Sequence, residues 1–179
     1  MQLAIRTGLD GDWEGMRQTF IQAGQAAWGH ILPATTLVDL IAPDRWRPGG
    51  GTDVLVADCR GEVTGFVCLS ASEDDDAEPT TGEIDACYAH PSVWGTGVGR
   101  ALVSAAATQL RASGFQEATL WTDHRNYRPL RFYHNAGWRL DGAERHRMFR
   151  DTELLELRHR RLLPWLDSGP TTRPMKRSG

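Results

Sequence analysis

The residues best suited to chemistry lie around a glycine-rich segment in the middle of the chain, WGTGVGR, in which Gly95, Gly97 and Gly99 alternate with other residues. A strand-like run that begins at Glu83 precedes this segment, and a helical run follows it. A glycine-rich turn at a helix N-terminus attracts anions, because unpaired backbone N–H groups converge there and the helix dipole adds positive potential. The spacing therefore predicts a phosphate-binding turn.

Two common phosphate-binding motifs do not fit this turn. A Walker loop requires Lys followed by Ser or Thr, whereas Gly99 is followed by Arg100 and Ala101. The dinucleotide fingerprint requires GxGxxG in an opening strand–helix–strand unit, whereas this turn is GxGxG and lies in the middle of the chain. The sequence therefore disfavours a P-loop nucleotidase and a Rossmann dinucleotide domain.

Three pieces of the sequence together resemble the cofactor-binding core of the GNAT superfamily of N-acetyltransferases. They are YAHPSVWGTGVGRAL at 88–102, then Asn126, then RFYHNAGW at 131–138, and they match the family in order and spacing. The order of the expected elements is also similar from about residue 2 to about residue 158. The resemblance implies an α/β fold with a mixed, mostly antiparallel central sheet that is flanked by helices and has splayed central strands.

The resemblance also implies how acetyl-CoA would bind as co-substrate. Its pyrophosphate is expected at the backbone N–H groups of the glycine turn, and its pantetheine arm is expected to pair with the preceding strand like an added strand. One strand amide is expected to polarise the acetyl carbonyl, and Asn126 to hydrogen-bond the pantetheine arm. The expected cofactor-binding residues are Cys87, Tyr88, Ala89, Trp94, Gly95, Thr96, Gly97, Val98, Gly99, Arg100 and Asn126.

Trp94 departs from the family pattern, because the family usually has Gln or Arg at the start of this turn. Backbone N–H groups can still bind phosphate, so the departure concerns the affinity for the cofactor more than the fold. It also keeps a second interpretation open, in which the protein is a non-catalytic acyl-CoA-binding sensor or regulatory module. Release of free thiol when an amine is added would distinguish an enzyme from a sensor.

Transfer of an acetyl group to an amine requires a base, because an amine with a pKa of about 10 is mostly protonated at neutral pH. Glu83 and Asp85 are candidates on the central strand, and two-residue alternation places them on the same face. We favour Glu83, because the resemblance puts it where the family often has a glutamate base that acts through water. Tyr133 matches the family's tyrosine that protonates the departing CoA thiolate. Glu83 and Tyr133 are therefore the expected catalytic residues.

The hydrophobic pattern predicts the elements that position these residues. Strands are expected at 2–7, 53–58, 62–70, 83–90, 117–122, 138–149 and 152–159. Two helices are expected after the first strand, one with an apolar stripe that begins at Trp13 and a short one that opens at Pro33. A third follows the glycine turn and ends at Gly114, and a fourth follows Asn126, a candidate N-cap, and ends at Gly137.

Length and composition indicate one globular domain. The chain has 179 residues, of which 40% are hydrophobic and 24% charged, so we expect one domain at 1–163 and a disordered tail at 164–179. No apolar run approaches the roughly 20 residues of a membrane span, and charge and glycine follow the first apolar residues too soon for a secretion signal. A cytoplasmic protein without a membrane partner is therefore expected.

Other features limit the choice of partners. The net charge of −3 argues against a nucleic-acid partner, and the cysteine and histidine spacing predicts no metal site. The acceptor is expected to be a primary amine of a small molecule or a peptide, and a homodimer is expected only by analogy with the family. Neither the acceptor nor a preference for acetyl over other acyl groups follows from the sequence.

Several polar or aromatic residues have weaker assignments. The acidic stretch at 73–78 is expected to be a solvated loop, with steering of a cationic acceptor as the less favoured alternative. His146 and His159 are expected to be exposed. Candidate substrate contacts are Asp123, His124 and Arg125 after a strand end, and Trp28, His30 and Trp46 in or after the early helices.

Overall fold

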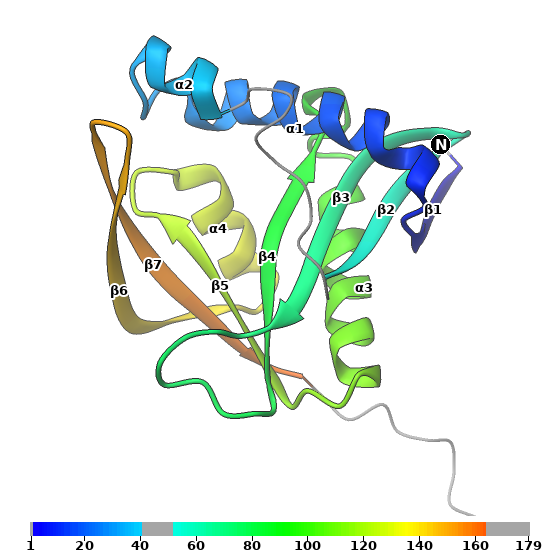
Figure 1. The fold of residues 1–179 in the computed structure, drawn as a ribbon. Coiled ribbons are helices and arrows are strands. Elements are labelled where there is room, and N and C mark those ends of the chain that lie inside the picture. Colours follow the sequence, from blue (N-terminus) through cyan, green and yellow to red (C-terminus); the bar gives the residue numbers. More distant parts are fainter. Residues whose placement is uncertain (1, 41–51, 164–179) are drawn as a thin grey trace, which may run out of the picture.

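The computed structural model describes residues 2–40 and 52–163 (Figure 1). Trp46 and the expected tail at 164–179 lie outside the described residues. The elements follow in the order β1 (Leu3–Thr7), α1 (Trp13–Trp28), α2 (Ala34–Leu40), β2 (Asp53–Cys59), β3 (Glu62–Ala71), β4 (Thr81–Ala89), α3 (Val98–Ala112), β5 (Glu117–Asp123), α4 (Tyr127–Asn135), β6 (Arg139–Phe149) and β7 (Thr152–Leu162).

The strands form one seven-stranded sheet in the order β1-β2-β3-β4-β5-β7-β6. Every neighbouring pair is antiparallel except β4 and β5, which are parallel. β4 and β5 pair only where Thr81–Glu83 lies beside Glu117–Thr119, and beyond Glu83 the two strands diverge (Figure 1). The mixed, mostly antiparallel sheet with splayed central strands is therefore confirmed.

Helices cover both faces of the sheet, and the alternation of side chains along β3 shows how. Phe66 and Cys68 point to the face covered by α1, where they pack with Met16 of that helix. Val67 and Leu69 point to the opposite face, where α3 and α4 cover a larger core. Because β3 is buried on both faces, its sequence is a continuous apolar run rather than an alternating one.

A β-bulge in β4 changes the register next to the gap between the strands. Cys68 pairs with Ala86, but Leu69 pairs with Ile84, so Asp85 is the extra residue. Ser70 pairs with Glu83, and its hydroxyl donates a hydrogen bond of 2.9 Å to the Asp85 carboxylate. Glu83 and Asp85 therefore lie on the same face of β4, the one that α1 covers.

No helix within residues 2–40 and 52–163 is long and apolar enough to cross a membrane.

Candidate active site

A cleft of about 560 Å³ opens where β4 and β5 diverge. Its walls come from the end of α1, the second half of β4, the glycine turn, the end of β5 and the first turns of α4. They include Trp28, Asp85, Cys87, Tyr88, Ala89, Trp94, Gly95, Thr96, Gly97, Gly99, Arg100, Trp121, Asp123, Asn126, Arg128, Tyr133 and Glu156. The cleft therefore brings together segments that lie far apart in the sequence.

The glycine turn exposes backbone N–H groups at the N-terminus of α3. Gly95 and Gly97 have φ values of 80° and 99°, a region that L-residues with a side chain rarely adopt. At the start of the helix, the Ala101 N–H donates to the Gly97 carbonyl at 3.0 Å. The preceding helical N–H groups, those of residues 98–100, have no acceptor among the described residues, as is usual in a first helical turn. They are available to an anion in the cleft.

The edge of β4 that faces β5 is also available for hydrogen bonding. His90 N–H donates to the Thr64 carbonyl of β3 at 2.9 Å, and backbone groups alternate in direction along an antiparallel strand. Cys87 and Ala89 consequently point their N–H and C=O groups away from β3 and toward the gap. One of these groups, the Ala89 carbonyl, already accepts a hydrogen bond of 2.8 Å from the indole N–H of Trp94.

Two residues between β5 and α4 shape the opposite wall. Asn126 occupies the N-cap position of α4, but its side chain makes no capping hydrogen bond and lines the cleft instead. Asp123 is fully buried and accepts hydrogen bonds from the Arg125 backbone N–H at 2.9 Å and Nε at 3.0 Å. Burial alone would raise the pKa of Asp123, but the bonds from Arg125 outweigh it and hold the pKa below its ordinary value. Asp123 is therefore ionised and already paired.

Tyr133 reaches into the cleft from α4 and is only 7% exposed. Its hydroxyl interacts with the Cys87 thiol of β4, while its ring packs edge-on against Trp138 and tilted against His159. Burial, and then the neighbouring thiol, raise the pKa of Tyr133 well above its ordinary value. The phenol is thus neutral at physiological pH and able to donate a hydrogen bond or a proton.

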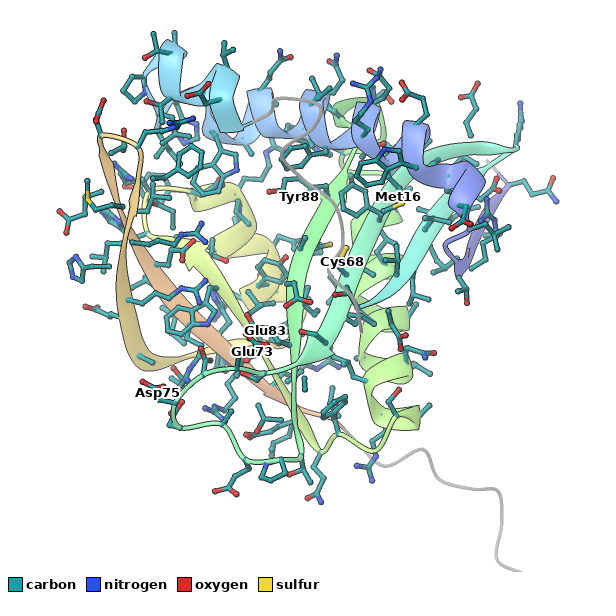
Figure 2. All side chains as sticks on the ribbon, in the orientation of Figure 1. Met16, Cys68, Glu73, Asp75, Glu83 and Tyr88 are labelled. Atoms are coloured by element: carbon teal, nitrogen blue, oxygen red, sulfur yellow. The ribbon has the colours of Figure 1, made fainter. Side chains whose placement is uncertain are left out.

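Glu83 lies at the point where β4 and β5 begin to diverge and is not among the residues that line the cleft (Figure 2). Its carboxylate accepts a hydrogen bond of 3.2 Å from Ser72 Oγ. Burial, and to a lesser degree the charges of Asp74 and Asp85, raise the pKa of Glu83 to about 7. A carboxyl group with this pKa can take up and release protons near neutral pH.

An ion-pair network lies beside Glu83. The acidic stretch is a mostly exposed loop, as expected, and in addition Arg158 of β7 binds Asp74 at 3.1 Å and Asp76 at 2.5 Å. Arg158 also binds Asp141 at 2.8 Å and is 5% exposed. The loop is therefore anchored to the far side of the sheet by contacts that no local pattern reveals.

The comparisons with known proteins agree with this geometry. The model of the acetyltransferase (GNAT) family matches residues 13–138. This chain belongs to the GNAT family. A mycothiol acetyltransferase from Sanguibacter keddieii is 33% identical over 108 residues, which are 60% of this chain and 33% of that protein. The chain thus matches only about a third of the length of this curated relative.

Solved structures show the same GNAT fold. PaiA N-acetyltransferase from Thermoplasma acidophilum, in complex with coenzyme A, aligns with a TM-score of 0.69 at 14% identity. The alignment covers 90% of this chain and 99% of that one. YncA from Salmonella typhimurium, with its cofactor acetyl-CoA, aligns with a TM-score of 0.67 at 21% identity, covering 96% and 99%. The family and the fold implied by the sequence resemblance are therefore confirmed.

The GNAT cleft gathers most of the expected site residues. All the expected cofactor-binding residues line it except Val98, whose side chain is fully buried in the core, so that only its backbone could contact a ligand. Tyr133 and Asp85 also line it, whereas Glu83 lies outside. Of the weaker candidates, Trp28 and Asp123 line the cleft.

Other lining residues were not expected from the sequence. They include Trp121, Arg128 and Glu156, which come from β5, α4 and β7. Nothing in their local sequence signals a site, because they meet only when the sheet is assembled. His159 was expected to be exposed but is 2% exposed, because β7 lies between β5 and β6 and the ring packs under Tyr133. Among the described residues, no cluster of His, Cys, Asp or Glu could hold a metal ion.

Proposed function

We propose that this protein is an acetyl-CoA-dependent N-acetyltransferase that transfers the acetyl group directly to a primary amine of a small molecule or a peptide. The observation that supports this most strongly is the open edge of β4 beside the exposed N–H groups of the α3 N-terminus, in one cleft. An extended chain that ends in a pyrophosphate matches both halves of this cleft. Membership of the GNAT family supports acetyl transfer in general.

The backbone is proposed to bind the co-substrate. N–H groups within residues 95–100, above all those of residues 98–100, would hold the pyrophosphate, since these donors lie at the positive end of α3. Cys87 and Ala89 would pair with the pantetheine arm, and one of their N–H groups would polarise the acetyl carbonyl. The Asn126 carboxamide, which caps no helix, would hydrogen-bond the arm from the opposite wall.

Two side chains are proposed to move the protons. Glu83, with a pKa of about 7, would accept a proton from the ammonium group through water, because Glu83 itself lies outside the cleft. The free amine would then attack the acetyl carbon to give a tetrahedral adduct. The nitrogen of this adduct would lose its second proton to water, and the carbon–sulfur bond would break. Tyr133 would give its phenolic proton to the departing thiolate and be reprotonated from solvent.

One observation favours a second candidate function, a sensor that binds acyl-CoA without turnover. The Trp94 indole N–H donates a hydrogen bond to the Ala89 carbonyl, so this acceptor on the β4 edge is not free for the pantetheine arm. A bound acyl-CoA could then be held in a position that does not bring its carbonyl to the catalytic groups. Turnover with any amine would exclude this alternative.

Thiol release from acetyl-CoA, measured with a panel of polyamines, aminoglycosides, amino acids and basic peptides, tests the proposal. Wild type, Tyr133→Phe and the control Tyr127→Phe would be compared, because Tyr127 is on the same helix but 73% exposed. We expect amine-dependent release that falls about tenfold in Tyr133→Phe, since CoA thiolate is a good leaving group, and that is unchanged in Tyr127→Phe. Binding of acetyl-CoA without release for any amine would favour the sensor.

Three further expectations stay predictions. Limited proteolysis would test the single domain at 1–163, and light scattering would test the homodimer. Cell fractionation would test the cytoplasmic location.

A further inference from the structure

Trp94 and Arg128 form a contact between the two sides of the cleft. Trp94 begins the glycine turn, and Arg128 is in the first turn of α4. The guanidinium carbon of Arg128 lies 4.1 Å from the centroid of the Trp94 ring, the geometry of a cation–π interaction, and both residues line the cleft. The contact therefore joins the glycine turn to α4.

Trp94 is held in place independently of Arg128. Its indole N–H donates to the Ala89 carbonyl at the end of β4, at 2.8 Å, and its side chain is partly buried. One edge of the ring is thus fixed to the sheet, while a ring face is presented to α4. Trp94 has the properties of a platform on which a planar cation can rest.

The position of Arg128 is not explained by the stability of α4. A cation in the first turn of a helix is disfavoured by the helix dipole, and α4 has no acidic residue in that turn to compensate. Among the described residues, Arg128 forms no ion pair. Arg125, three residues earlier, is by contrast held by the Asp123 carboxylate at 2.8 Å.

The electrostatics of the cleft differ between its two ends. Arg100 and Arg128 are the two arginines among its described lining residues, and both belong to the wall around the glycine turn. Of the three lining carboxylates, Asp123 is paired with Arg125, and Glu156 is paired with Arg145 of β6 at 2.7 Å. The third, Asp85 of β4, accepts a hydrogen bond from Ser70 Oγ. The uncompensated positive charge is thus concentrated where backbone N–H groups already converge.

We propose that Arg128 binds a phosphate of the CoA co-substrate and that Trp94 is the positioning residue that holds its guanidinium over the cleft. The inference rests on the proposed function, because it assumes that the cleft takes CoA. Stacking uses the face of the guanidinium and leaves the N–H groups in its plane free, so Arg128 can stack on Trp94 and grip a phosphate with two donors at once. Trp94 would then contribute to binding indirectly, because it holds the charged guanidinium of Arg128 in place.

Titration calorimetry of CoA and of 3′-dephospho-CoA tests this proposal. The variants would be Arg128→Gln, Trp94→Leu and their double mutant, with Arg131→Gln as the control, because Arg131 is an exposed arginine on the same helix that does not line the cleft. Loss of a charge-assisted hydrogen bond is expected to weaken CoA binding about tenfold or more in Arg128→Gln. Arg131→Gln is expected to bind as wild type does.

The two ligands identify the phosphate. If Arg128→Gln weakens CoA and 3′-dephospho-CoA equally, Arg128 binds the pyrophosphate. If it weakens CoA alone, Arg128 binds the 3′-phosphate. Either result supports the proposal, whereas unchanged binding of both ligands overturns it.

The double mutant tests the role of Trp94. If Trp94 acts by positioning Arg128, Trp94→Leu should weaken binding in the wild-type background and add little in the Arg128→Gln background. Trp94→Phe keeps an aromatic face and should rescue much of the loss. Additive losses would overturn the positioning role.

The inference and the proposed function fail in different ways. If wild type binds neither ligand, both fail. If wild type binds CoA and Arg128→Gln binds it equally well, the inference alone fails.

Discussion

The two ends of the cleft are built in different ways. The proposed cofactor end consists mainly of backbone groups, at the glycine turn and the open edge of β4. The opposite end borders a region around Glu83 that is built from side chains, with Arg158 joining the acidic loop to β7 and Arg145 joining β6 to Glu156. A backbone site needs only residues that permit its conformation, whereas a side-chain site needs partners delivered by distant segments. Mutations should therefore have different consequences at the two ends.

Removal of Arg158 is expected to have the largest effect and tests this contrast most directly. Arg158→Met should lower the free energy of unfolding by about 3 kcal/mol, because it leaves the mostly buried Asp74 carboxylate without its cationic partner and Asp141 with Arg160 alone. Urea denaturation followed by circular dichroism measures this loss. Arg147→Met is the control, because Arg147 is an exposed arginine of the neighbouring strand. Equal stability of the two variants would show that the network does not hold the loop.

Glu83→Gln should damage catalysis without damaging the cofactor end. We expect kcat to fall about 100-fold, the lower range for loss of a general base, while the affinity for acetyl-CoA is unchanged. In wild type, kcat/KM should rise as the pH increases through about 7, because Glu83 is the base only when ionised. The variant should lose this rise. A wild-type pH profile retained in Glu83→Gln would assign the base to another group, with Asp85 the first candidate.

The same variant has a second signature in stability. The pKa of Glu83 is raised from its ordinary value of 4.5 to about 7 in the folded protein, so its ionised form is penalised only when folded. Its contribution to stability therefore declines as the pH rises from about 4.5 to about 7. Glu83→Gln should remove this decline and be relatively more stable at pH 8 than at pH 4.

The smallest effect is expected at the glycine turn. Gly97→Ala meets no neighbouring atom, but it puts a Cβ on a residue with a φ of 99°. Holding alanine in this backbone conformation costs about 1 kcal/mol, which corresponds to about a fivefold loss of acetyl-CoA affinity. Calorimetry measures this loss. Gly11→Ala is the control, because Gly11 has equally open space and no such φ. A loss of thermal stability without a loss of affinity would show that the glycine turn is not part of the acetyl-CoA binding site.

Much of the proposed cofactor end could be predicted from the sequence because its information is local. Gly95 and Gly97 permit a left-handed backbone, and Gly99 adds no side chain to the first turn of α3. The hairpin between β2 and β3 is equally local, since Arg60 and Gly61 both have positive φ at its turn. Asn126 was placed correctly before α4, but its side chain does not serve as the expected cap.

The remaining features depend on which segments meet in the folded chain. Arg158 lies 84 residues from Asp74, and no spacing in the sequence pairs them. His159 looks like an exposed residue among arginines, and only the position of β7 between β5 and β6 buries it. The sequence by itself determined the family, the order of the elements and the glycine-rich turn before α3, because these depend on backbone conformation and local periodicity. Tertiary structure decided the pKa of Glu83, the anchoring of the acidic loop and the Trp94–Arg128 contact, because burial and charge pairing exist only once distant strands and helices are packed together.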